Sequence, residues 1–142
     1  MSSSGPETTT ASRIVLDTST YSHARRGVEV AIDAIVRAEI VIVPIIVLGE
    51  LEAGFRVGSR FRENRRALDE FLSEPFVQVL SADADTAARY GETFAALRRA
   101  GTPIPVNDIW IAAATLACGA HLVTFDEDFS AIPGLPLTLL RA

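Results

Sequence analysis

The sequence predicts an α/β fold in which helices flank a mostly parallel central sheet of four to five strands. Three observations predict it: short apolar runs alternate with helical segments, the segments between runs can hold crossover helices, and neither an internal repeat nor an interdomain linker interrupts the pattern. The chain has 142 residues, 49% of them hydrophobic, so it can bury one core of ordinary size and has little room for another. We therefore expect one domain over residues 13–142.

Residues 1–12 differ in composition from the rest of the chain. They are rich in Ser and Thr and have neither the basic nor the apolar segment of a signal peptide, so we expect a disordered leader. No apolar run approaches the roughly 18 residues that span a bilayer, because the longest, 40–48, is interrupted by Pro44. We expect a cytoplasmic protein with no membrane contact.

Five short runs, rich in Val, Ile and Leu, are expected to form the strands. They are residues 13–16, 39–43, 77–80, 121–124 and 137–140. Runs this short and this apolar are typical of strands that helices cover on both faces.

The segments between these runs predict the helices. In 28–37, apolar residues recur at helical spacing with Glu29, Asp33 and Arg37 on the other side. The other expected helices are 45–55, 60–72, 84–100 and 107–118, with Pro44 and Asp83 suited to helix starts and Gly119 to a helix end. The segment 107–118 is almost wholly apolar after its first two residues, so this helix should be buried on most sides.

Two residue counts exclude whole classes of chemistry. The single cysteine, Cys118, cannot form an intramolecular disulfide or a zinc site built from cysteines. All 13 basic residues are arginine, so no mechanism that requires a lysine applies. The chain has neither a Walker sequence nor a Gly-x-Gly-x-x-Gly turn, which argues against a nucleotide-binding module.

Four acidic residues from distant parts of the chain are expected to meet at one edge of the sheet. Asp17 directly follows the run 13–16, and Asp126 stands two residues after the run 121–124. Glu50 lies on the helix after the second strand, and Asp108 opens the apolar helix 107–118. In folds of this class, ligands bind beyond the carboxyl ends of the strands, where the strand order reverses.

Such a group of carboxylates predicts a metal site. Crowded carboxylates repel one another and are tolerated chiefly when a cation binds between them, and the stretches around these four carry no arginine. An all-oxygen site suits Mg²⁺ or Mn²⁺. Each acid also has a plain alternative: Asp17 and Asp126 as turn or cap residues, Asp108 as a residue favoured by the helix dipole, and Glu50 as an exposed helix residue.

The arginines leave two interpretations open. The net charge of −5 is unusual for a protein that binds nucleic acid, but the arginines are clustered. The cluster comprises Arg56, Arg60, Arg62, Arg65 and Arg66, with Arg25 and Arg26 earlier in the chain. It predicts either a local basic face or a solvated helix surface paired with neighbouring acids at helical spacing.

Taken in order, four short motifs resemble those of the PIN-domain family, more narrowly the VapC-type toxin ribonucleases of bacterial toxin–antitoxin systems. The resemblance covers residues 14–140. The motifs are Val15-Leu16-Asp17-Thr18-Ser19, Gly49-Glu50-Leu51 with Gly54, Asn107-Asp108-Ile109-Trp110-Ile111-Ala112-Ala113, and Leu122-Val123-Thr124-Phe125-Asp126. The family's four acids fall on Asp17, Glu50, Asp108 and Asp126.

The resemblance implies a PIN-like three-layer fold and an endoribonuclease that cleaves RNA with Mg²⁺ or Mn²⁺. It implies that Asp17, Glu50, Asp108 and Asp126 are both catalytic and metal ligands, and Asp128 could share the role of Asp126. Thr124 matches a hydroxyl position that helps to orient metal-bound water.

The resemblance also implies partners. A VapB-type antitoxin would wrap the toxin, and a homodimer is expected. Apolar residues between Val47 and Phe61 are candidate contacts for the antitoxin, and core packing accounts for most of them equally well. Two alternatives remain open at this point: a non-catalytic PIN scaffold that binds RNA or protein, and a housekeeping nuclease that processes RNA.

Overall fold

The computed structural model describes residues 12–142, so the predicted leader lies outside it except for Ser12. Within this range the strands form one parallel sheet in the order β4-β3-β2-β5-β6. The strands are β2 (Arg13–Leu16), β3 (Ile40–Pro44), β4 (Val77–Leu80), β5 (His121–Thr124) and β6 (Leu137–Leu139). The predicted α/β class with a parallel sheet is confirmed.

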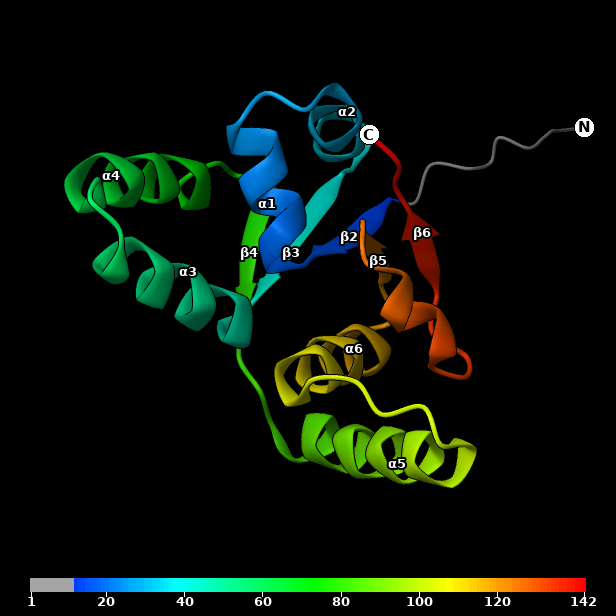
Figure 1. The fold of residues 1–142 in the computed structure, drawn as a ribbon. Helices are drawn as coiled ribbons and strands as arrows, with labels where there is room; N and C mark the ends of the chain where they lie inside the picture. Colours follow the sequence, from blue (N-terminus) through cyan, green and yellow to red (C-terminus); the bar gives the residue numbers. More distant parts are fainter. Residues whose placement is uncertain (1–11) are drawn as a thin grey trace, which may run out of the picture.

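Helices cover both faces of this sheet (Figure 1). They are α1 (Thr18–Arg25), α2 (Glu29–Arg37), α3 (Ile45–Val57), α4 (Phe61–Leu72), α5 (Ala84–Ala100) and α6 (Val106–Cys118), with a short 3₁₀ helix, η1 (Glu127–Ala131). Figure 1 shows α5 and α6 together on one side of the sheet and α1 and α2 on the other, while α3 and α4 form a hairpin beside α1. The expected three-layer architecture is therefore confirmed.

The core is built on the three central strands. Val15 in β2, Val41 in β3 and Leu122 in β5 are completely buried, as expected for parallel strands covered on both faces. From the other layer, Ile111–Thr115 of α6 are all buried, and the small side chains among them let this helix approach the sheet closely. The nearly apolar sequence of α6 thus predicted its burial correctly.

One helix was not predicted. The sequence of α1, Thr-Ser-Thr-Tyr-Ser-His-Ala-Arg, has weak helix formers and no apolar periodicity. The helix forms because the Asp17 side chain caps it, accepting a hydrogen bond from the backbone N–H of Thr20 at 2.9 Å. Asp126 caps η1 in the same way. The cap interpretation of these two acids is thus correct.

The chain order places the reversal point between β2 and β5. From the central strand β2 the chain builds β3 and then β4 on one side, and later returns to add β5 and β6 on the other. Asp17 follows β2 and Asp126 follows β5, so the two acids flank this point. No helix within residues 12–142 is both long enough and apolar enough to cross a membrane.

Gly119 offers a test of the connection between α6 and β5. It ends α6 in the left-handed conformation, with φ of 68°, and a Cβ atom there would touch nothing within 4 Å. We expect Gly119→Ala to lower the free energy of unfolding by about 1–2 kcal/mol through backbone strain alone. As a control, Gly91→Ala inside α5 also meets open space, has no positive φ, and should raise stability by about 0.5–1 kcal/mol. Urea denaturation of both variants checks the opposite signs.

Candidate metal centre

Asp17 is the buried anchor of the candidate site, with only 5% of its surface exposed. Its Oδ1 accepts hydrogen bonds from the backbone N–H of Thr20 and from the Thr20 hydroxyl, at 2.9 and 2.6 Å. Its Oδ2 accepts from the Thr124 hydroxyl at 2.5 Å. Because neutral donors reach both oxygens, the polar atoms of this buried carboxylate have hydrogen-bond partners and the side chain is fixed in place.

The hydroxyls of Thr20 and Thr124 also link Asp17, which follows β2, to strand β5. Thr20 Oγ1 also lies 3.0 Å from the carbonyl oxygen of Val123, and Thr124 Oγ1 accepts the backbone N–H of Asp126 at 3.0 Å. Both threonines are completely buried. Asp126 is thereby held close to Asp17, and its own Oδ1 accepts the N–H of Asp128 at 2.9 Å.

Glu50 reaches the site from α3, and neutral donors hold both of its oxygens. The Thr18 hydroxyl, in the first turn of α1, donates to Oε1, and the Asn107 amide, in the first turn of α6, donates to Oε2 at 3.1 Å. Glu50 therefore connects three helices that begin at the same edge of the sheet. Its partly buried side chain has the partners that an acid on an apolar helix requires.

Asp108 lies among the other acids, and the charges of these acids contribute to the raised pKa of its carboxyl. The pKa of this carboxyl is raised from 3.8 to about 6, chiefly by burial and then by the charges of Asp126, Glu50, Asp17 and Asp128, in that order of importance. No hydrogen bond of the Asp108 side chain is found within residues 12–142. The four predicted acids are thus electrostatic neighbours, and Asp128 adds the weakest contribution.

Within residues 12–142, no basic side chain forms an ion pair with this group. The ion pairs within the described part of the chain use other acids, such as Glu52, Glu63 and Asp85. Over residues 12–142, no three His, Cys, Asp or Glu side chains already surround a point as they would surround an ion. Hydroxyl and amide donors hold Asp17 and Glu50 in separate positions, and mutual repulsion also favours separation of the carboxylates.

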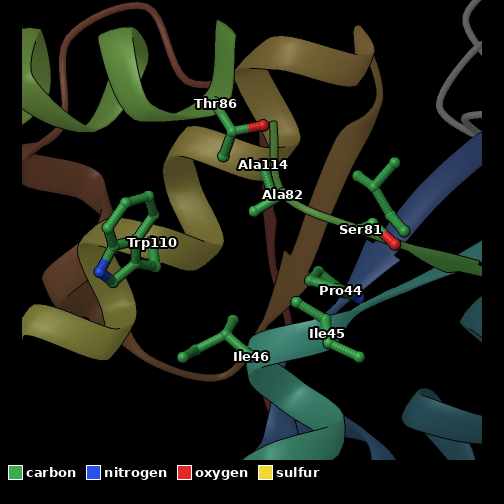
Figure 2. Close-up of a pocket in the computed structure, with 9 residues that line it drawn as sticks. Pro44, Ile45, Ile46, Ser81, Ala82, Thr86, Trp110 and Ala114 are labelled. Atoms are coloured by element: carbon green, nitrogen blue, oxygen red, sulfur yellow. The ribbon is translucent and has the colours of Figure 1, made fainter. Parts of the chain in front are cut away.

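A neighbouring pocket has a different character. A cavity of about 200 Å³ lies between the start of α3, the start of α5 and Trp110 of α6. Figure 2 shows the residues that line it. Ile45, Ile46 and Ala82 supply much of its lining, and none of the four acids lines it. Trp110 stacks on Tyr90 with ring centroids 4.1 Å apart. This apolar cavity lacks the oxygen ligands that a hard cation needs.

The comparison with known families agrees with the fold. The family model described as "PIN domain" matches residues 14–135, which is most of the chain. The chain belongs to the PIN domain family. All four acids of the candidate centre fall inside the matched range.

Curated relatives narrow this assignment within the PIN domain family. The chain is 31% identical over 91 residues to ribonuclease VapC4 of Mycobacterium tuberculosis, covering 64% of this chain and 70% of the relative. It is 36% identical over 93 residues to ribonuclease VapC2 of Rickettsia felis, covering 65% and 68%. It is 27% identical to ribonuclease VapC5 of M. tuberculosis over 89% of this chain and 92% of the relative. This PIN domain is thus of the VapC type.

Solved structures agree with the fold over nearly the whole PIN domain. VapBC2 from Rickettsia felis, bound to a promoter DNA fragment, superposes with a TM-score of 0.79 at 27% identity, covering 89% of this chain and 98% of that one. VapBC from Salmonella typhimurium, also bound to DNA, superposes with a TM-score of 0.77 at 25% identity, covering 89% and 96%.

The sequence did not identify three of the side chains that organise the centre. Thr18, Thr20 and Asn107 hold Asp17 and Glu50. Thr18 and Asn107 stand within the quoted motifs, but the resemblance implied a role only for Thr124 among the neutral residues. One signal was available for Thr20: an aspartate followed three residues later by a helical position is an N-cap pattern. Nothing local predicts that Asn107 contacts Glu50, because 57 residues separate them.

The pKa of Asp108 predicts a pH dependence of stability. Because the folded-state pKa of about 6 exceeds the ordinary 3.8, folding favours the protonated form. This contribution is complete below about pH 4 and is lost as the pH rises through about 6. We expect the unfolding midpoint of metal-free protein to be lower near pH 8 than near pH 5, and Asp108→Asn to remove most of the difference. Denaturation in EDTA measures it.

The control for this experiment is Asp33→Asn, on the exposed face of α2. This substitution removes one negative charge without altering the candidate centre, and it should leave the pH dependence as in the wild type. An equal loss of pH dependence in both variants would assign the effect to net charge.

The Thr20 hydroxyl supports Asp17, and its removal tests that support. Thr20→Val keeps the shape of the side chain but leaves Asp17 Oδ1 with one donor fewer in a buried position. We expect it to lower the free energy of unfolding by about 1–3 kcal/mol relative to Thr20→Ser, which keeps the hydroxyl. Urea denaturation compares the two variants. Equal stability would mean that the hydroxyl does not contribute.

Proposed function

We propose that this VapC-type PIN domain protein is the toxin of a type II toxin–antitoxin system and cleaves RNA endonucleolytically with Mg²⁺ or Mn²⁺. One observation carries the proposal: Asp17, Glu50, Asp126 and Asp128 act on the pKa of Asp108, while no arginine pairs with any of the four predicted acids within residues 12–142. The names of its relatives, ribonucleases VapC4, VapC5 and VapC2, supply the substrate class.

The residues present fit a hard divalent cation. The centre offers only oxygen donors, and Asp108, raised in pKa by burial and by its neighbours, carries the repulsion that a cation would relieve. Asp17, Glu50, Asp108 and Asp126 would hold the ion, with Asp128 able to share the part of Asp126. When bound, such an ion lowers the pKa of water and stabilises charge on a phosphoryl group.

Asp17 and Glu50 have different parts in the candidate centre. Asp17 is held by Thr20 and Thr124, so its oxygens are fixed before any ligand arrives. The donors of Glu50 are Thr18 and Asn107, and these lie at helix starts nearer the surface than Thr20 and Thr124. We infer that Asp17 orients the centre and that Glu50 adjusts to the ligand.

The partners follow from the same relatives. VapBC complexes from several bacteria share this fold, and we propose that this chain binds a VapB-type antitoxin in the cytoplasm and forms a homodimer. Of the candidate contacts between Val47 and Phe61, Val47 and Leu51 are buried, so core packing accounts for these two. Val57, which is 89% exposed, remains available in this segment.

Cleavage of a single-stranded RNA substrate by the purified protein tests the activity. We expect cleavage with Mg²⁺ or Mn²⁺, none in EDTA, and a loss of at least about a hundredfold in Asp17→Asn, more than residues that only orient ligands usually cause. Asp33→Asn, on α2, serves as the matched control and should cleave like the wild type. Calorimetric titration with Mn²⁺ should show weaker binding by Asp17→Asn.

Three results would contradict the proposal in different ways. RNA binding without cleavage under any metal condition would indicate a non-catalytic scaffold. Equal cleavage by Asp17→Asn, or cleavage unaffected by EDTA, would reject the mechanism. Cleavage without growth inhibition on expression would favour a housekeeping nuclease over a toxin.

A further inference from the structure

A basic groove lies between the end of α1 and the α3–α4 hairpin. It consists of two adjoining hollows of about 410 Å³ each, which share Arg25 and Glu63. Arg26 and Arg60 line one hollow, and Arg62 and Arg66 line the other. We call this feature the arginine groove, defined by Arg25, Arg26, Arg60, Arg62 and Arg66.

The charges of the arginine groove are largely uncompensated. On the same two helices, Arg56 and Arg65 form ion pairs with Glu52, and Arg65 also pairs with Asp69. Of the groove arginines, only Arg60 forms an ion pair within residues 12–142, with Glu63 at 3.1 Å and exposed to solvent. Five arginines thus face two acids, Glu63 and Glu70, on a chain whose net charge is −5. Such a local excess of positive charge suits a polyanion.

Other groups in the wall suit a nucleic-acid strand. Phe55 supplies an aromatic side chain beside the arginines, the combination found in grooves that bind single strands. Ser22 and Asn64 supply neutral polar groups. The hydroxyl of Tyr21, another lining residue, is buried and has no hydrogen-bond partner in the described part of the chain. An apolar protein segment would gain little from this lining.

The arginine groove is directly connected to the candidate metal centre by α1. This helix begins at the cap residue Asp17, where Thr18 contacts Glu50, and ends at Arg25. Its eight residues span about 12 Å. A strand whose phosphate lies at the acids can therefore continue along α1 into the arginine groove.

We propose that the arginine groove binds backbone phosphates of single-stranded RNA whose scissile phosphate lies at the acidic centre. The inference rests on the proposed function and adds the path of the substrate. The arginines supply the attraction that the acidic centre and the negative net charge would otherwise oppose. Contacts of this kind position the strand without reading its sequence.

Fluorescence anisotropy with a labelled single-stranded RNA tests the proposal. Binding is measured in EDTA, where cleavage does not interfere, over a series of salt concentrations. We expect Arg25→Ala/Arg26→Ala and Arg62→Ala/Arg66→Ala each to weaken binding by at least about fivefold at low salt. The slope of log affinity against log salt should become shallower by about 0.7 for each phosphate that a variant no longer neutralises.

Arg98→Ala/Arg99→Ala is the matched control. These two arginines are also adjacent and exposed at the end of a helix, α5, and their removal changes the net charge equally. The control should bind like the wild type, and Arg25→Lys/Arg26→Lys should keep most of the affinity because it keeps the charge. Thermal unfolding of each variant verifies that it is folded.

The outcomes separate this inference from the proposed function. An equal loss of affinity in all three double-alanine variants would reduce the effect to net charge, and unchanged RNA binding in both groove variants would assign the groove to another ligand, such as an acidic protein segment. Either result overturns the inference. If the wild type binds RNA through the arginines but never cleaves it with Mg²⁺ or Mn²⁺, the proposed function fails, whereas the assignment of RNA phosphates to the arginine groove stands.

Discussion

The structure depends on one electrostatic constraint: several carboxylates share one edge of the sheet, and none of them has a basic partner in the described part of the chain. Asp17 meets this constraint in the most buried position, where the hydroxyls of Thr20 and Thr124 and one backbone N–H stabilise its charge. In Asp108, the same crowding appears as a pKa that burial and the neighbouring carboxylates raise. Both responses are those expected of acids that lack a counter-ion.

The same carboxylates also serve as structural elements. Asp17 caps α1 and Asp126 caps η1, so each acid that follows a central strand also starts the next helical segment. Glu50 is held by residues of α1 and α6. The functional and the structural interpretations of these acids are therefore compatible, because a cap uses only some of a carboxylate's acceptor capacity.

Much of the fold could be predicted because its strands are buried on both faces and appear in the sequence as short apolar runs. The proximity of the acids could be predicted as well, since parallel strands bring their carboxyl ends to one edge. Helix α1 could not, because its Thr and Ser residues give no periodic signal and a single cap starts it. The support of Glu50 by Asn107 could not either, because it depends on how α3 and α6 pack.

The pairing of β2 with β5 has a consequence for biosynthesis. Thr124 and Asp17 contact each other although 107 residues separate them, and β2 has β5 as one of its two neighbours. A nascent chain that has not yet extended past β5 lacks both Asp126 and the hydroxyl that fixes Asp17. Emerging and truncated chains therefore cannot assemble the full set of acids, and the complete centre arises only after nearly all of the domain has been translated.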